Sequence, residues 1–327
     1  HPMRKLHMNQ VQPNKGMKAF TLRVSVLEHC QLRCAYCLPK ALSMLAKKDW
    51  LSLSHYEQIA RVLARFSFRK IRFTGGEPLL REELPQIVAI FAQAIPSAPL
   101  ALTTNGQRFC AMAEALKDAG LNTITIHIDS LKAERYQRLM GKGELAEALR
   151  AVEKAKTLGL RPKVNVVVQR GLNDDELSSF LEFSKETGVM VRFIELMDTG
   201  SARDFVAAHF ISGRNILAKL AHLGIVPKPR AHPSDPARLF LAEQQDVLFG
   251  LIASDTEPFC SHCDRLRLSA NGKIYTCLYE PLGEALNLEA DDDALFREIN
   301  LKINRKESLH PSANKSRRLF SMSQTGG

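Results

Sequence analysis

The stretch TLRVSVLEHCQLRCAYC, residues 21–37, decides the fold of this chain. Its opening run, 21–27, is rich in β-branched and apolar residues and predicts a buried strand. A loop with Cys30, Cys34 and Cys37 follows directly. Three thiolates at this spacing can meet at one metal centre, whereas structural zinc and ordinary iron–sulfur sites take four protein ligands. We therefore expect a metal centre with one open position; the alternative is a zinc ion completed by His29.

The first two hundred residues repeat the pattern that starts with this strand. Short β-rich runs alternate with amphipathic segments in which apolar residues recur at helical spacing. The runs are TLRVSVL (21–27), KIRFTG (70–75), PLALTT (99–104), TITIHID (123–129), PKVNVVV (162–168) and VMVRFIEL (189–196). Such alternation predicts βαβ units and a parallel sheet, and six units are fewer than a closed eight-fold barrel needs. The predicted fold class is α/β, with a partial, open six-unit βα barrel of the TIM type.

The second part of the chain has a different pattern. PKPRAHPSDPARL (227–239) is rich in turn formers and predicts an exposed connection. RLRLSANGKIYTCL (265–278) predicts a hairpin that turns at Asn271-Gly272. We predict two domains, a barrel over residues 1–198 and a smaller C-terminal α+β region over 199–327.

Composition narrows the class of partner. The net charge is +10, from 45 Lys and Arg against 35 Asp and Glu, which fits an anionic ligand or a generally basic surface. Patterns typical of nucleic-acid or membrane binding are lacking, so we expect neither partner and favour an anionic small molecule. We find no signal peptide and no apolar run of membrane-spanning length. Six of the seven cysteines fall in two tight clusters, which favours metal binding in a reducing compartment. We expect a cytoplasmic protein.

The first cysteine loop resembles that of the radical S-adenosylmethionine (SAM) superfamily. The family motif is C-x-x-x-C-x-aromatic-C, and Tyr36 stands at the aromatic position. TGGEP follows at 74–78, at the end of the next strand, as it does in the family. The resemblance implies that Cys30, Cys34 and Cys37 hold a [4Fe-4S] cluster. SAM would bind the fourth iron and yield a 5′-deoxyadenosyl radical with an electron from an external donor.

The resemblance also implies where SAM binds. The glycines of TGGEP would let the backbone approach the methionine end of SAM, and Glu77 would take its ammonium group. A tight turn explains the glycines as well, and core packing explains Met197. The expected SAM-binding residues are Tyr36, Gly76, Glu77, His127 and Met197.

FCSHCDRLRLSANGKIYTCL, residues 259–278, carries the second trio, Cys260, Cys263 and Cys277. Taken alone, this spacing is also explained by structural zinc. In company with the first trio it predicts a second [4Fe-4S] cluster with an open iron. Cys110 stands apart on a predicted helix, where we expect it to be buried as an apolar residue.

This stretch resembles the GTP 3′,8-cyclase family of molybdenum cofactor biosynthesis, in which C-x-x-C is followed by Arg-x-Arg-Leu and a third cysteine. The chain also ends in Gly326 and Gly327, as the family does. The resemblance implies that GTP binds between the two clusters and becomes 3′,8-cyclo-7,8-dihydro-GTP. It implies a downstream partner in the pathway, cyclic pyranopterin monophosphate synthase, and a possible homodimer.

The family pattern assigns residues to catalysis and to GTP. A triphosphate needs several cations, and residues two apart on a strand share a face, as Arg265 and Arg267 do. Each basic residue alone is also explained as a surface cation, and Thr103 as an ordinary strand residue. The implied catalytic residues are Arg265, Arg267, Gly326 and Gly327. The implied GTP-binding residues are Arg23, Arg72, Thr103, Lys163, Arg192, Arg265 and Arg267.

Three positions depart from the family pattern. His127 replaces a serine that contacts SAM, His29 replaces an arginine, and Thr325 replaces an isoleucine before the terminal glycines. Two other interpretations stay open. One is a twin-cluster radical SAM maturase that modifies a peptide. The other is a zinc-stabilised domain whose basic surface binds nucleic acid.

Overall fold

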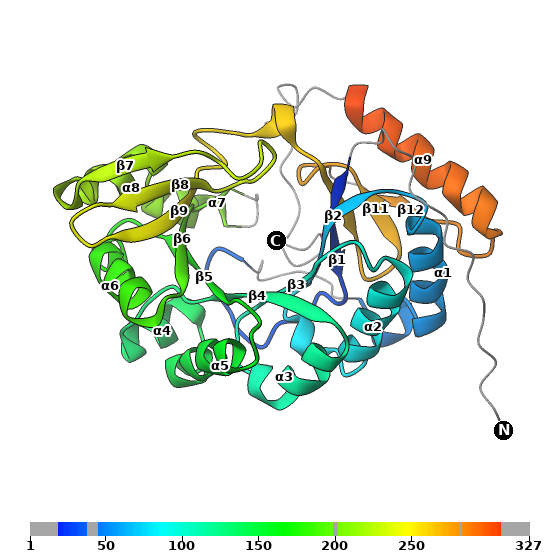
Figure 1. Cartoon of the computed structure of the whole chain (residues 1–327), viewed down its shortest axis with the longest axis horizontal. Helices are drawn as coiled ribbons and strands as arrows, with labels where there is room; N and C mark the ends of the chain where they lie inside the picture. The colour runs from blue at the N-terminus through cyan, green and yellow to red at the C-terminus, as the bar shows by residue number, and fades with distance from the viewer. Residues whose placement is uncertain (1–18, 38–44, 199–201, 281–282, 309–327) are drawn as a thin grey trace.

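The computed structural model of the chain describes residues 19–37, 45–198, 202–280 and 283–308. Thr325, Gly326 and Gly327 lie outside the described residues, so their predicted roles stay predictions. Within these ranges twelve strands form one sheet, in the order β12-β11-β10-β1-β2-β3-β4-β5-β6-β9-β8-β7. The sheet curves around an open barrel (Figure 1).

All six predicted strands are present, and neighbouring strands among them pair in parallel. They are β1 (Phe20–Ser25), β2 (Phe68–Thr74), β3 (Leu100–Thr104), β4 (Leu121–His127), β5 (Lys163–Val168) and β6 (Met190–Glu195). The partial βα barrel is therefore confirmed.

Helices cover the outside of these strands (Figure 1). They are α1 (Leu53–Leu63), α2 (Leu84–Ala94), α3 (Phe109–Asp118), α4 (Ala133–Met140), α5 (Leu145–Thr157) and α6 (Leu177–Thr187), with short 3-10 turns η1 (Lys47–Asp49) and η2 (Pro78–Leu80). No helix in the described part of the chain combines the length and the apolar content that crossing a bilayer requires.

The C-terminal region extends the same sheet at both ends. β9 pairs in parallel with β6, and β10 pairs in parallel with β1. The remaining elements are α7 (Arg203–His209), α8 (Gly213–Lys219), η3 (Ala221–Leu223), β7 (Ile225–Lys228), β8 (Arg238–Ala242), β9 (Val247–Ile252), η4 (Cys260–His262), β10 (Arg265–Leu268), β11 (Lys273–Tyr275), β12 (Glu284–Ala285) and α9 (Asp292–Ser308). β10 and β11 form the predicted hairpin, in which Gly272 has a left-handed φ of 77°. The predicted domain boundary at residue 198 stays a prediction.

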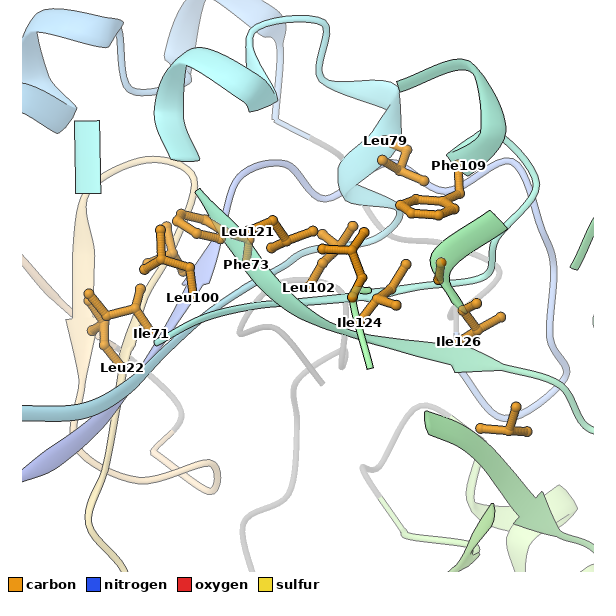
Figure 2. Packing of buried hydrophobic residues seen from close by; sticks show 14 of the residues in the cluster. Leu22, Ile71, Phe73, Leu79, Leu100, Leu102, Phe109, Leu121, Ile124 and Ile126 are labelled. Carbon is orange, nitrogen blue, oxygen red and sulfur yellow. The ribbon is translucent and has the colours of Figure 1, made fainter. Parts of the chain in front are cut away.

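Each barrel strand presents two chemically different faces. Apolar side chains such as Leu22, Ile71 and Phe73 are buried between the strands and the helices (Figure 2). Successive side chains of a strand point to opposite faces, so Arg23 and Arg72, which lie next to these residues in sequence, point into the barrel. TIM barrels usually fill this interior with branched apolar residues. Here the strands line it with polar and charged groups, which suits a charged ligand.

The C-terminal helix α9 packs along α1 (Figure 1). Arg61 pairs with Asp292 at 3.0 Å and Arg65 with Asp293 at 2.8 Å. The rings of Phe66 and Phe296 lie 4.9 Å apart. These contacts hold the first turns of α9 against α1 and the residues that follow it.

The prediction for Cys110 was wrong, because its side chain is exposed on α3. The buried face of this helix consists of Phe109, Ala113 and Leu116. Cys110 lies one position away from that face, about 100° around the helix axis.

Candidate active site

A cavity of about 210 Å³ opens at the carboxyl ends of the barrel strands. The first cysteine trio lines it, together with all five residues predicted to bind SAM: Tyr36, Gly76, Glu77, His127 and Met197. Thr103, predicted to contact GTP, lines it as well. The topology therefore gathers residues from five different strands and their loops at one place, as expected for the carboxyl edge of a parallel sheet.

The TGGEP turn holds the cysteine loop through the main chain. The Gly76 N–H donates to Leu27 O at 2.8 Å, and the Glu77 N–H donates to His29 O at 2.7 Å. A Cβ atom on Gly76 would lie 2.2 Å from His29 O, so a larger residue does not fit. The glycine is needed for contact between the two loops. The predicted contact of its backbone with SAM remains a prediction.

Glu77 ties the ends of β2 and β3 together. Its carboxylate accepts hydrogen bonds from the Thr104 hydroxyl at 2.5 Å, the Asn105 N–H at 2.8 Å and the Leu79 N–H at 3.1 Å. Burial nevertheless raises the pKa of Glu77 to about 7. A bound ammonium group would favour the ionised form, which is compatible with the predicted role toward SAM.

His127 is held at the cavity wall by two other side chains. Its Nε2 lies 2.6 Å from the Tyr36 hydroxyl and 3.1 Å from Asp129 Oδ1. Asp129 Oδ2 accepts a hydrogen bond from Tyr36 at 2.7 Å, and Oδ1 accepts one from the Val167 N–H at 2.8 Å. Burial alone would lower the pKa of His127, but the charge and hydrogen bond of Asp129 raise it above its usual value. The histidine that departs from the family pattern therefore has a fixed orientation.

A group of basic side chains occupies the barrel interior. The sheet register places Arg23 directly beside Arg72 on one side and Arg267 on the other. Burial and mutual repulsion lower the pKa of Arg72 to about 9 and of Arg267 to about 10. The predicted cations Lys163 and Arg192 and the half-buried Lys70 belong to the same interior group.

Hydroxyl groups orient two of these cations. Arg72 Nη1 donates to the Thr103 hydroxyl at 2.8 Å and to the Thr125 hydroxyl at 3.1 Å. Arg192 Nη2 donates to the same Thr125 hydroxyl at 3.0 Å. Asp235 offsets part of the charge of Arg192 and Lys163, but burying several like charges side by side remains unfavourable, so the interior is suited to an anionic ligand.

The second trio lies beside this cationic group. It consists of the half-buried residues Cys260, Cys263 and Cys277. The negative charges of Cys263 and Cys277 raise the pKa of Arg267 and so offset part of its lowering by burial. Lys306 Nζ, at the end of α9, lies 3.8 Å from Cys263 Sγ. Burial raises the pKa of Cys263, but the charge of Lys306 lowers it, and the net shift is downward. The donor set fits a cationic metal centre.

The first trio also fits a positive centre. Burial raises the pKa of Cys30 to about 12 and that of Cys37 to about 11. Thiolates at these positions therefore need a bound metal to offset the loss of solvent. In the described part of the chain no three His, Cys, Asp or Glu side chains are grouped as ligands of one ion. A [4Fe-4S] cluster uses one cysteine per iron, so its sulfurs do not meet at one point.

Sequence reasoning missed three residues of the site. Asp129 follows His127 by two positions, and residues at this spacing on a strand share a face, so the spacing could have indicated that the two side chains meet. Asn165 lines the cavity with a buried Oδ1 that has no hydrogen-bond partner among the described residues. Lys70 lies two residues before Arg72 on β2 and shares its face.

Comparison with known proteins identifies the family. The models of the radical SAM superfamily and of Molybdenum Cofactor Synthesis C match residues 24–184 and 189–312. The GTP 3′,8-cyclase of Aquifex aeolicus is 38% identical over 282 residues, which cover 85% of this chain and 88% of that protein. The GTP 3′,8-cyclase of Yersinia pestis is 34% identical, with 93% and 94% covered. The chain belongs to the GTP 3′,8-cyclase family.

Solved structures with lower identity share the fold of this cyclase-family chain. Streptococcus suis SuiB bound to S-adenosylmethionine aligns with a TM-score of 0.62 at 14% identity, covering 86% of this chain and 67% of SuiB. SuiB bound to the precursor peptide SuiA aligns at 0.64 and 12% identity, covering 92% and 67%. At such identities the likeness concerns the fold alone. The peptide-maturase interpretation is therefore not favoured over the cyclase family.

Proposed function

We propose that this protein converts GTP into 3′,8-cyclo-7,8-dihydro-GTP in molybdenum cofactor biosynthesis. The observation that carries the proposal is the group of like-charged side chains inside the barrel, directly below a three-cysteine loop. Family membership supports the same reaction. The proposal therefore rests on the site as well as on similarity.

The cationic interior would bind the triphosphate. A nucleoside triphosphate carries roughly four negative charges, and guanidinium groups bind phosphate oxygens through paired hydrogen bonds. Arg72 and Arg192 are already oriented by Thr103 and Thr125, so little side-chain ordering remains when the nucleotide binds. Bound phosphate would also relieve the repulsion that lowers the arginine pKa values.

The cavity above the cations would hold SAM. Cys30, Cys34 and Cys37 would hold a [4Fe-4S] cluster, which with SAM and an external electron donor supplies a 5′-deoxyadenosyl radical. Asn165 Oδ1, which has no hydrogen-bond partner among the described residues, could accept a hydrogen bond from a ligand hydroxyl. His127, fixed by Asp129, can donate one into the same cavity.

The second trio would hold a second [4Fe-4S] cluster near Arg265 and Arg267. Those two arginines would bind GTP, and the terminal Gly326 and Gly327 would enter the site as slender backbone. A carboxy-terminal extension is therefore expected to slow turnover, and equal rates for extended and native ends would contradict this role. Cyclic pyranopterin monophosphate synthase would take the product, and a homodimer is the proposed assembly.

Anaerobic turnover tests the proposal directly. Reconstituted protein with a reductant, SAM and GTP should form 5′-deoxyadenosine and a cyclised nucleotide, both identified by mass. Products from a peptide but none from GTP would favour the maturase. Iron analysis should give about eight irons per chain with matching sulfide. Zinc without labile sulfide would favour the binding domain.

A further inference from the structure

One loop of the C-terminal region reaches across the open side of the barrel. Residues 229–237 connect β7 to β8 and are here named the clasp. β7 and β8 lie at one end of the sheet, whereas β1, β2 and β10 lie on the opposite side of the opening (Figure 1). The clasp nevertheless forms hydrogen bonds and ion pairs with Arg69 of β2 and with Asp264 and Arg265 at the start of β10. It therefore joins the two ends of the sheet.

The clasp is anchored through a buried carboxylate. Asp264 is 2% exposed and Ser234 of the clasp is also 2% exposed. The Ser234 hydroxyl donates to Asp264 Oδ2 at 2.9 Å and accepts from Arg69 Nη2 at 2.6 Å. Arg69 also pairs with Asp264 at 3.0 Å and with Asp235 of the clasp at 3.1 Å. Two prolines, Pro233 and Pro236, flank Ser234 and Asp235 and restrict their loop.

Ser234 also contacts Arg265, which follows Asp264 and is the first residue of β10. Its main-chain carbonyl accepts a hydrogen bond from Arg265 Nη2 at 3.2 Å. On another side the Arg265 guanidinium lies over the Phe259 ring, 4.5 Å from its centroid. Arg265 lies two residues before Arg267 on β10, so the two side chains share the face of the strand that lines the cationic interior. Ser234 thus holds both the anchor, Asp264, and the adjacent arginine.

We propose that the clasp positions Arg265 for the nucleotide, with Ser234 as the positioning residue. This rests on the proposed function, because Arg265 is a proposed GTP ligand. The Ser234 hydroxyl holds the clasp against Asp264 and Arg69. The main-chain carbonyl of Ser234 is therefore held in place, and its hydrogen bond orients the Arg265 guanidinium. Without the Ser234 hydroxyl, the clasp shifts, the Ser234 carbonyl moves with it, and the Arg265 guanidinium loses its defined orientation. The SAM cavity lies at the opposite strand ends and is left unchanged.

The test uses reconstituted, full-length protein and measures dissociation constants for GTP and SAM. Ser234→Ala should weaken GTP binding about tenfold, the size expected for one lost buried hydrogen bond, and should change SAM binding less than about twofold. Ser234→Thr keeps the hydroxyl and should restore GTP binding. Ala231→Ser changes an exposed residue of the same loop and serves as the control.

A double-mutant cycle separates positioning from general stabilisation. In an Arg265→Ala background, Ser234→Ala should cause no further loss of GTP affinity. An additive loss, an equal loss of SAM affinity, or an unchanged GTP affinity of Ser234→Ala in the native background would overturn the inference. If the native protein itself binds SAM but not GTP, the proposed function fails first, and the two failures are distinguishable.

Discussion

Arg192 shows the conflict between binding and stability at the scale of a residue. Its Nε is buried without a hydrogen-bond partner among the described residues, and burial lowers its pKa to about 10. Gly250 leaves room for its stem, since a Cβ there would lie 2.9 Å from Arg192 Cγ. Burial therefore makes the charged form less favourable than it is in water, and the charge of Asp235 offsets only part of this loss. Active-site residues often oppose stability in this way.

Arg192→Met should therefore stabilise the nucleotide-free protein while it weakens GTP binding. Methionine fills a similar volume without a charge, so the free energy of unfolding should rise by about 1 kcal/mol. GTP affinity should fall at least tenfold, because a charge-assisted phosphate contact is lost. Urea unfolding and equilibrium nucleotide binding measure the two effects.

The exposed Arg214 is the matched control for this change, and Arg214→Met should alter neither quantity. A destabilised Arg192→Met protein that binds GTP normally would contradict the account. It would show that Arg192 is a structural cation.

Lys70 predicts a pH dependence of GTP binding. Burial, together with the charges of Arg72 and Lys163, lowers its pKa to about 8. The protonated form attracts phosphate, so affinity should be highest below pH 8 and fall as the pH rises through 8. Between pH 7 and 8.5 the loss should be about fourfold if Lys70 alone titrates. The arginine of Lys70→Arg keeps its charge over this range, so this variant should show little change of GTP affinity with pH. A pH dependence equal to that of the native protein would show that Lys70 does not contribute to GTP binding.

Single site residues could be predicted where their chemistry requires a fixed spacing in the sequence. The cysteine trios and the arginines at strand positions could be read from the sequence, because metal ligands and alternating strands impose fixed intervals. Ser234 and Asp264 lie 30 positions apart, and nothing local links them. Asp129 gave only a weak signal, since any strand can end in an acidic residue.

At the scale of elements, the cysteine loop depends on the turn after β2. The two segments are joined by main-chain hydrogen bonds at Gly76 and Glu77, and the approach leaves no space for a side chain at Gly76. The turn after β2 therefore supports the cysteine loop as well as the wall of the cavity. Sequence reasoning identified both segments but explained the glycines by SAM binding or by a tight turn, and not by contact with the cysteine loop.

Gly76→Ala should displace the cysteine loop, because the new Cβ would lie 2.2 Å from His29 O and 2.4 Å from Glu28 O. We expect loss of the first cluster, so that iron falls from about eight to about four per chain. Gly159→Ala is the control, since among the described residues no atom beyond its chain neighbours lies within 4 Å of its Cβ position. That change should cost only about 1 kcal/mol of backbone strain and leave the iron content intact. Full iron content in Gly76→Ala would contradict the proposed support.

At the scale of the whole molecule, the barrel and the C-terminal region share one sheet. β10, from the C-terminal region, pairs with β1, and β9 pairs with β6. This arrangement brings Arg267 beside Arg23 and places the second cysteine trio next to the cationic interior. The proposed polyanion site is therefore complete only when both regions are folded.

The barrel was predictable because its strands and helices alternate locally. The joining of β9 and β10 to its edges was not, because these pairings connect residues far apart in sequence. Periodicity indicates that a strand exists but does not identify its partner. The segment 227–239 was predicted as an exposed connection; residues 229–237 do connect β7 to β8, but Ser234 is buried, and this anchor could be found only in the structure.

Transfer of a labelled hydrogen tests the central claim most directly. GTP carrying deuterium on the 3′ ribose carbon would be incubated without oxygen with reduced, reconstituted protein and SAM. If the barrel presents that carbon to the SAM cavity, one deuterium should appear in 5′-deoxyadenosine, with a cyclised nucleotide formed in equal amount. Unlabelled 5′-deoxyadenosine, or label transferred only from another position of the nucleotide, would contradict the account.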